Sequence, residues 1–84
     1  MASGRLMLYS RPGCHLCDEM KAVVEPVARQ LGWIIEEIDI SGDAALEAQF
    51  GSEIPVLFVN GRKAFKYRVS AGELRQRLRR EPSG

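Results

Sequence analysis

One loop organises this chain: Tyr9-Ser10-Arg11-Pro12-Gly13-Cys14-His15-Leu16-Cys17. It follows an apolar run at residues 6–9 and precedes a segment whose apolar residues recur at helical spacing, so the two cysteines are expected where a loop turns into a helix. Unpaired backbone N–H groups and the dipole at a helix N-terminus favour a negative charge. We therefore predict that Cys14, at the helix start, is the attacking thiolate and that Cys17, one turn deeper, is the resolving thiol.

The two cysteines are the only ones in the chain, and this narrows their role. A structural disulfide across three residues removes little entropy from the unfolded chain. A structural zinc site needs four ligands, and two cysteines with His15 between them are too few. Haem attachment needs a histidine after the second cysteine, where this chain has Asp18. Redox chemistry is the class of function that remains.

The size and the net charge of the chain limit the number of domains and the kinds of partner to be expected. At 84 residues with 45% apolar content, the chain is expected to form one globular domain, residues 1–84, with frayed tails at 1–4 and 81–84. A net charge of +1 gives no reason to expect a nucleic acid or a membrane as partner. The apolar run at 6–9 is too short for a signal peptide or a membrane span. We expect a cytoplasmic monomer without a metal site or a tightly bound cofactor.

Strand and helix signals alternate along the chain. The apolar run at 6–9 indicates a strand covered on both faces in the middle of a sheet, and Glu36 indicates an edge position for the second strand. Two strands joined by a helix form a parallel, right-handed βαβ unit. Asn60-Gly61 is the preferred two-residue hairpin turn, so the fourth strand should return antiparallel. The predicted strands are 6–9, 33–40, 54–59 and 62–67, and the predicted helices are 14–31, 44–50 and a last one opening at 70.

Helix boundaries have local signals. Asp43 is expected to cap the second helix, and Ser70 with Glu73 forms a capping box for the last. Gly32 and Gly51 are expected to close the first two helices as glycines at the C′ position.

The fourth strand carries an alternating pattern. Alternation puts Ala64, Lys66 and Arg68 on one face and Lys63, Phe65, Tyr67 and Val69 on the other. The basic residues of this strand either bind an acidic partner or simply keep an edge strand solvated and unpaired.

With these elements in order, the chain resembles the glutaredoxins of the thioredoxin-fold superfamily, in particular the small bacterial-type glutaredoxin-like proteins. That family opens with an aromatic-Ser-basic-Pro-aromatic-Cys-x-x-Cys pattern, which the loop at 9–17 follows except at Gly13, and the likeness covers nearly the whole chain. It implies an α/β thioredoxin-like fold in the order β-α-β-α-β-β-α, with a four-stranded mixed sheet flanked by three helices. It also implies a thiol-disulfide oxidoreductase that uses Cys14 and Cys17 to reduce protein disulfides or glutathione mixed disulfides.

The resemblance suggests further site residues. It implies a cis Ile54-Pro55 bond facing Cys14, where the backbone of Ile54 would align a substrate peptide or glutathione; alternatively, the proline merely starts an edge strand. Arg11 is either close to the sulfur or to a ligand carboxylate, or it is an exposed loop arginine. His15 either stabilises the thiolate when protonated or is a solvated spacer.

The chain also departs from the family pattern. Glutaredoxins carry Gly-Gly before the last helix, and the amides just after it hold the γ-glutamyl carboxylate of glutathione. Here the matching place is Val69-Ser70, although the amides of Ala71 and Gly72 could still receive a carboxylate. The dipeptide between the cysteines is His15-Leu16 rather than Pro-aromatic, and Gly13 replaces an aromatic residue, which leaves more room above Cys14. The electron donor is therefore either glutathione or thioredoxin reductase.

Two other functions stay open on the sequence alone. A non-enzymatic binding or redox-sensing module would present Ile54-Pro55 and the basic edge strand to a partner. An iron–sulfur protein would ligate a cluster through Cys14 of two chains with external glutathione.

Overall fold

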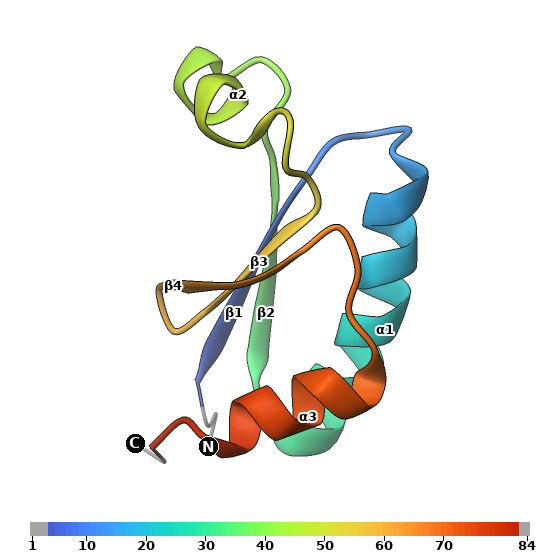
Figure 1. The fold of residues 1–84 in the computed structure, drawn as a ribbon, viewed down its shortest axis with the longest axis vertical. Helices are drawn as coiled ribbons and strands as arrows, with labels where there is room; N and C mark the ends of the chain where they lie inside the picture. Colours follow the sequence, from blue (N-terminus) through green and yellow to red (C-terminus); the bar gives the residue numbers. More distant parts are fainter. Residues whose placement is uncertain (1–3, 83–84) are drawn as a thin grey trace.

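The computed structural model describes residues 4–82, which form a four-stranded mixed sheet with three helices (Figure 1). The elements are β1 (Arg5–Ser10), α1 (His15–Leu31), β2 (Ile34–Asp39), α2 (Ala44–Phe50), β3 (Val56–Val59), β4 (Arg62–Lys66) and α3 (Ala71–Arg79). This confirms the predicted order of elements and the predicted sheet.

The strand order β2-β1-β3-β4 puts β1, the strand that leads into the cysteine loop, inside the sheet. β1 pairs parallel with β2 and antiparallel with β3, and β4 is antiparallel to β3. The predicted central place of β1 and the edge places of β2 and β4 are therefore confirmed. The register pairs Tyr9 with Val56, so β3 begins at the end of the sheet where β1 leads into the cysteine loop.

The helices cover opposite faces of the sheet. Leu6 and Leu8 of β1 are fully buried in the larger core cluster, which also contains Val24 of α1 and Leu74 of α3. Because side chains alternate along a strand, Tyr9 points to the other face and meets α2 there. In Figure 1, α2 lies beyond the upper end of the sheet, α1 runs along its side and α3 crosses near its lower end.

A small aromatic cluster fixes α2. The rings of Tyr9 and Phe50 stack with centroids 4.5 Å apart, and Phe58 meets both rings edge-on at 5.3 Å and 5.7 Å. Phe50 is 3% exposed, and it is the one buried residue of this short helix. The N-terminal end of α2 is capped as predicted, because Asp43 accepts hydrogen bonds from the amides of Ala45 and Leu46.

Gly32 closes α1 in the left-handed conformation as predicted, with φ 72°. Gly51 closes α2, also as predicted, but it does not adopt the left-handed conformation. Gly51 has a right-handed φ of −53°. Close approach explains the glycine instead, because a Cβ atom there would lie 2.5 Å from the backbone oxygen of Glu47 and 3.7 Å from Nη2 of Arg11.

The prediction of which side chains of the fourth strand share a face of the sheet was wrong. Leu57 pairs with Phe65 and Phe58 with Lys63, so Ala64 is the extra residue of a β-bulge. Ala64 and Phe65 consequently both pack against the larger core cluster. The strand ends at Lys66, one residue earlier than predicted.

The predicted tails are shorter than expected within the described residues. The carbonyl of Gly4 accepts a hydrogen bond from the Ile34 amide at 3.0 Å. Glu81 pairs with Arg77 at 2.6 Å and accepts a hydrogen bond from Asn60 at 2.9 Å. The rest of the predicted tails, except Pro82, lies outside the described residues. Between residues 4 and 82, every helix is too short or too polar to cross a membrane.

Replacing Phe50 by alanine is expected to lower the free energy of unfolding by about 3–5 kcal/mol, because it opens a cavity in the cluster that holds α2. Urea denaturation followed by circular dichroism measures this loss. Phe50→Leu is the matched control, since it keeps most of the apolar volume and should cost less than half as much. A loss below about 1 kcal/mol for Phe50→Ala would mean that the cluster does not anchor α2.

Candidate active site

Cys14 occupies the N-cap position of α1. Its backbone is extended, with φ −89° and ψ 112°, and its Sγ accepts a hydrogen bond from the Cys17 amide at 3.2 Å. The sulfur thus takes the place of the side-chain oxygen that usually caps a helix, next to the positive end of the helix dipole. Cys14 is half-buried and Cys17 is 2% exposed, so the sulfur open to a substrate is that of Cys14.

The environment of Cys17 keeps its sulfur protonated. Burial raises the pKa of Cys17 to about 12, and the hydrogen bond to Cys14 acts in the same direction, while a backbone hydrogen bond from Arg11 opposes both. Both cysteines carry free thiols in this structure. The pair therefore joins an accessible sulfur at a helix N-terminus to a buried thiol that is hydrogen-bonded to it.

The loop before Cys14 is a tight turn. The Cys14 amide donates to the Arg11 carbonyl at 3.3 Å, and Gly13 has a φ of +78°, which strains any residue with a side chain. A Cβ atom on Gly13 would meet nothing within 4 Å. The space next to Cys14 in the chain is thus open, in agreement with the room that the sequence suggested at this position.

The Ile54-Pro55 peptide bond is cis, as the resemblance implied. The strand register places this bond at the end of β1 that leads to Cys14. Neither the N–H nor the carbonyl of Ile54 has a hydrogen-bond partner among residues 4–82. These two groups are available to pair with an extended peptide.

Tyr67 is a neighbour of this proline that the sequence did not reveal. Its amide donates to the Pro55 carbonyl at 2.8 Å and its hydroxyl donates to the Ser52 carbonyl at 3.3 Å. It adopts a φ of +70° and is 42% exposed. The sequence showed only an aromatic residue at the end of a predicted edge strand. Aromatic residues without a functional role are equally common at such positions.

A hollow of about 180 Å³ adjoins Tyr67 on the side of α1. Its lining residues are Glu19, Met20, Val23, Tyr67, Arg68 and Val69. The hollow has room for a side chain of a bound polypeptide, and its walls are mostly apolar.

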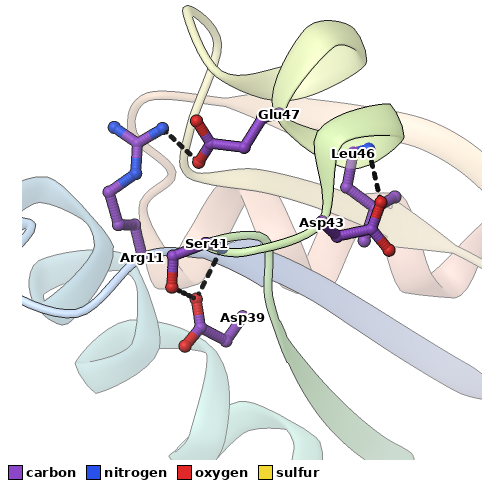
Figure 2. Close-up of polar contacts among 6 residues, drawn as sticks. All are labelled: Arg11, Asp39, Ser41, Asp43, Leu46 and Glu47. Atoms are coloured by element: carbon purple, nitrogen blue, oxygen red, sulfur yellow. Dashed lines mark hydrogen bonds and ion pairs between the residues drawn. The ribbon is translucent and has the colours of Figure 1, made fainter.

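Arg11 lies near both sulfurs but pairs with a carboxylate of its own chain. Its Nη2 donates to Oε1 of Glu47 at 2.7 Å (Figure 2). The pKa of Arg11 is raised first by this hydrogen bond and by the charge of Glu47, and further by the charges of Cys14 and Cys17. The structure thus shows Arg11 as a partly exposed arginine of the cysteine loop that is already paired with a carboxylate of the same chain, and its role toward a ligand stays a prediction.

Three carboxylate side chains line a hollow together with Arg11. This hollow of about 240 Å³ is lined by Ser10, Arg11, Pro12, Asp18, Glu37 and Asp39. Hydrogen bonds from the hydroxyl and the amide of Ser41 lower the pKa of Asp39, and the charge of Arg11 lowers it further. No group of His, Cys, Asp or Glu side chains within residues 4–82 is arranged to hold a metal ion.

The remaining predicted residues are less closely tied to the sulfurs. His15 is exposed at the first turn of α1, and it forms no hydrogen bond or ion pair with the side chains of residues 4–82. Ala71 and Gly72 open α3, where the capping box satisfies the amides of Ser70 and Glu73. Roles for His15, Ala71 and Gly72 in tuning or binding stay predictions.

The chain is similar in sequence to known proteins of one family. Residues 5–79 match the family described as Glutaredoxin-like domain (DUF836). A Mycobacterium tuberculosis protein, Rv0508, is 27% identical over 89 aligned positions, which cover 100% of this chain and 92% of that protein. A Dictyostelium discoideum protein described as a glutaredoxin-like YDR286C homolog is 28% identical and covers 82% of this chain and 69% of its own length.

Solved structures give the same result for the fold. The X-ray structure of protein XcR50 from X. campestris is 35% identical, covers 92% of this chain and 99% of its own, and superposes with a TM-score of 0.77. A thioredoxin from Halobacterium salinarum is 24% identical, covers 92% and 73%, and has a TM-score of 0.63, which supports the thioredoxin fold. The match over residues 5–79 shows that the chain belongs to the glutaredoxin-like domain family.

Proposed function

We propose that this protein is a thiol-disulfide oxidoreductase in which Cys14 attacks and Cys17 resolves. The observation that carries the proposal is the sulfur of Cys14 at the N-cap of α1, open to substrate and hydrogen-bonded by the Cys17 amide. The buried thiol of Cys17 supports it, because a resolving cysteine must stay protonated and close while the first sulfur reacts.

The proposed reaction is two successive thiol–disulfide exchanges. The Cys14 thiolate attacks one sulfur of a substrate disulfide, and the other sulfur leaves as a thiolate that takes up a proton. Cys17 then loses its proton and attacks Sγ of Cys14, which forms the Cys14–Cys17 disulfide and releases the second substrate thiol. The substrate gains two electrons and the protein loses two.

An electron donor then has to reduce the Cys14–Cys17 disulfide. Glutathione or thioredoxin reductase would fill this role, and the substrates would be protein disulfides or glutathione mixed disulfides. The cycle needs cysteines that are kept reduced between turnovers, which a cytoplasmic location would provide.

The groups around the proline turn suggest how a polypeptide substrate binds. The free backbone groups of Ile54 would pair with the substrate main chain beside Cys14. The exposed ring of Tyr67 and the hollow next to it would contact substrate side chains. These contacts favour a protein disulfide over a small one.

Cys14→Ser should reduce turnover of a disulfide substrate at least about a hundredfold, because the attacking sulfur is lost. Cys17→Ser should instead stop the reaction after the first exchange and accumulate a mixed disulfide on Cys14, visible by mass spectrometry. Full activity of Cys14→Ser would exclude the mechanism. No turnover by the wild-type protein with any disulfide and either donor would favour a non-enzymatic binding module.

The pKa of Cys17 can be measured in the Cys14→Ser variant, which has a single thiol. Its thiolate absorbance at 240 nm should appear only well above pH 9, because burial, the main cause of the raised pKa, is kept in the variant. In urea the same thiol should titrate near its ordinary value of about 8.5. The folded protein is thus favoured at neutral pH and loses this contribution as the pH rises toward 12. A folded-state titration near the urea value would contradict the assignment.

Tyr67→Ala should lower kcat/KM for a protein disulfide about fivefold or more, because an exposed aromatic ring beside the proline turn would contribute strongly to binding a polypeptide. Activity on hydroxyethyl disulfide, which is too small to reach the ring, should change less than twofold. Tyr67→Phe is the matched control, since it keeps the ring and removes only the hydroxyl. Equal losses on both substrates would show that Tyr67 supports the proline turn rather than the substrate.

A further inference from the structure

We propose that Glu47 is a specificity-determining residue, which occupies the guanidinium of Arg11 and thereby disfavours small thiols that carry carboxylates. Glutathione, with two carboxylates, is the main thiol of this class. The inference rests on the proposed function, because it concerns which thiols react at Cys14.

The pairing of Arg11 with Glu47 joins two distant parts of the chain. Arg11 lies in the loop between β1 and α1, and Glu47 lies in α2, 36 residues later. Their closest nitrogen and oxygen are 2.7 Å apart, and the side chains are 38% and 39% exposed. Figure 2 shows the guanidinium directed at the carboxylate across the gap between the loop and α2.

Packing places Glu47 opposite Arg11. Phe50 stacks on Tyr9, which is two residues before Arg11, and this fixes α2 relative to the loop. Asp43 caps the start of the helix by accepting a hydrogen bond from the Leu46 amide (Figure 2). The absence of a Cβ atom on Gly51 leaves the backbone free to approach the guanidinium closely.

The charges around Arg11 act against a second carboxylate. Its charge is matched by Glu47, and Arg11 also lines a hollow that contains Asp18, Glu37 and Asp39, of which Glu37 is paired with Lys21 at 3.0 Å. A ligand carboxylate that binds the guanidinium must displace Glu47, and in the hollow it would also come close to the charges of Asp18 and Asp39. A neutral thiol meets no such obstacle.

The Arg11–Glu47 pair is expected to affect the rate at which a thiol reduces the Cys14–Cys17 disulfide. A thiolate attacks the sulfur of Cys14, the disulfide breaks, and Cys17 leaves and takes up a proton. A second thiol attacks the resulting mixed disulfide, releases the Cys14 thiolate and leaves as the oxidised dimer of the thiol. Arg11 belongs to the loop that holds Cys14, and its carbonyl accepts a hydrogen bond from the Cys14 amide at 3.3 Å, so a carboxylate on the incoming thiol comes close to the Arg11 side chain in the first step.

The test compares glutathione with its diethyl ester, which has the same thiol but no free carboxylate. Oxidised wild-type and Glu47→Gln proteins are mixed with each thiol, and the rate constant for disulfide reduction is followed by stopped flow. The ratio of the two rate constants, glutathione over ester, should rise about two- to fivefold in Glu47→Gln, since a half-exposed ion pair is weak. Comparing ratios between variants cancels the difference in intrinsic reactivity of the two thiols.

Glu53→Gln is the matched control. Glu53 also pairs with a cation, Lys63, at 2.8 Å, so the substitution removes the same charge without touching Arg11. Its ratio should equal the wild-type ratio. Adding Arg11→Gln to Glu47→Gln should return the ratio to the wild-type value or below, because no guanidinium is left to bind the carboxylate.

Two results would overturn the inference: an unchanged ratio in Glu47→Gln, which includes an equal acceleration by both thiols, or the same rise of the ratio in Glu53→Gln. Failure of the proposed function gives a different result, because neither thiol nor dithiothreitol would then reduce a Cys14–Cys17 disulfide in the wild-type protein. Urea denaturation of each variant shows whether a changed ratio comes from a folded protein.

Discussion

The hydrogen bond from the Cys17 amide to the sulfur of Cys14 is the constraint on which the site depends. It exists because Cys14 is the N-cap of α1, and Cys14 reaches that position through a turn that needs the left-handed conformation of Gly13. The helix then buries Cys17 on the same stripe as Met20 and Val24. One short loop thus decides both where the helix starts and which sulfur is open to a substrate.

The sheet supplies the second half of the site. β1 lies inside the sheet, so the strand beside it, β3, starts where β1 ends and brings Ile54-Pro55 to the cysteine loop. β4 returns along β3, and Tyr67 follows its end and bonds to the Pro55 carbonyl. The site is therefore built at one end of the sheet from segments that are separated by about 40 to 50 residues in the chain.

Local signals predicted the parts of this structure that local chemistry determines. The cap at Asp43, the capping box at Ser70 and the turn at Asn60-Gly61 are each decided by a few neighbouring residues. The bulge at Ala64 and the close contact at Gly51 depend on residues from other elements, so the chain gave no local sign of them.

The residues of the candidate site likewise fall into those that the sequence identified and those that only the folded structure identified. The Cys-x-x-Cys pair was evident in the sequence, and the proline followed from the family resemblance. Tyr67 and Glu47 were not evident, because their importance comes only from what they touch after folding. Glu81 shows the same effect at the C-terminal end, where a partner four residues away and Asn60 turn an expected tail into an ordered contact.

Two residues of α2 differ in how much they contribute to the stability of the fold. Phe50 is almost fully buried and holds the helix through apolar contacts worth several kcal/mol, whereas a half-exposed pair such as Arg11 and Glu47 contributes about 0–1 kcal/mol. Loss of the pair therefore leaves α2 and the cysteine loop in place. What changes is the charge next to the sulfurs, because the guanidinium is then left with no carboxylate in direct contact. A contact that matters little for stability can in this way decide which thiols react at Cys14.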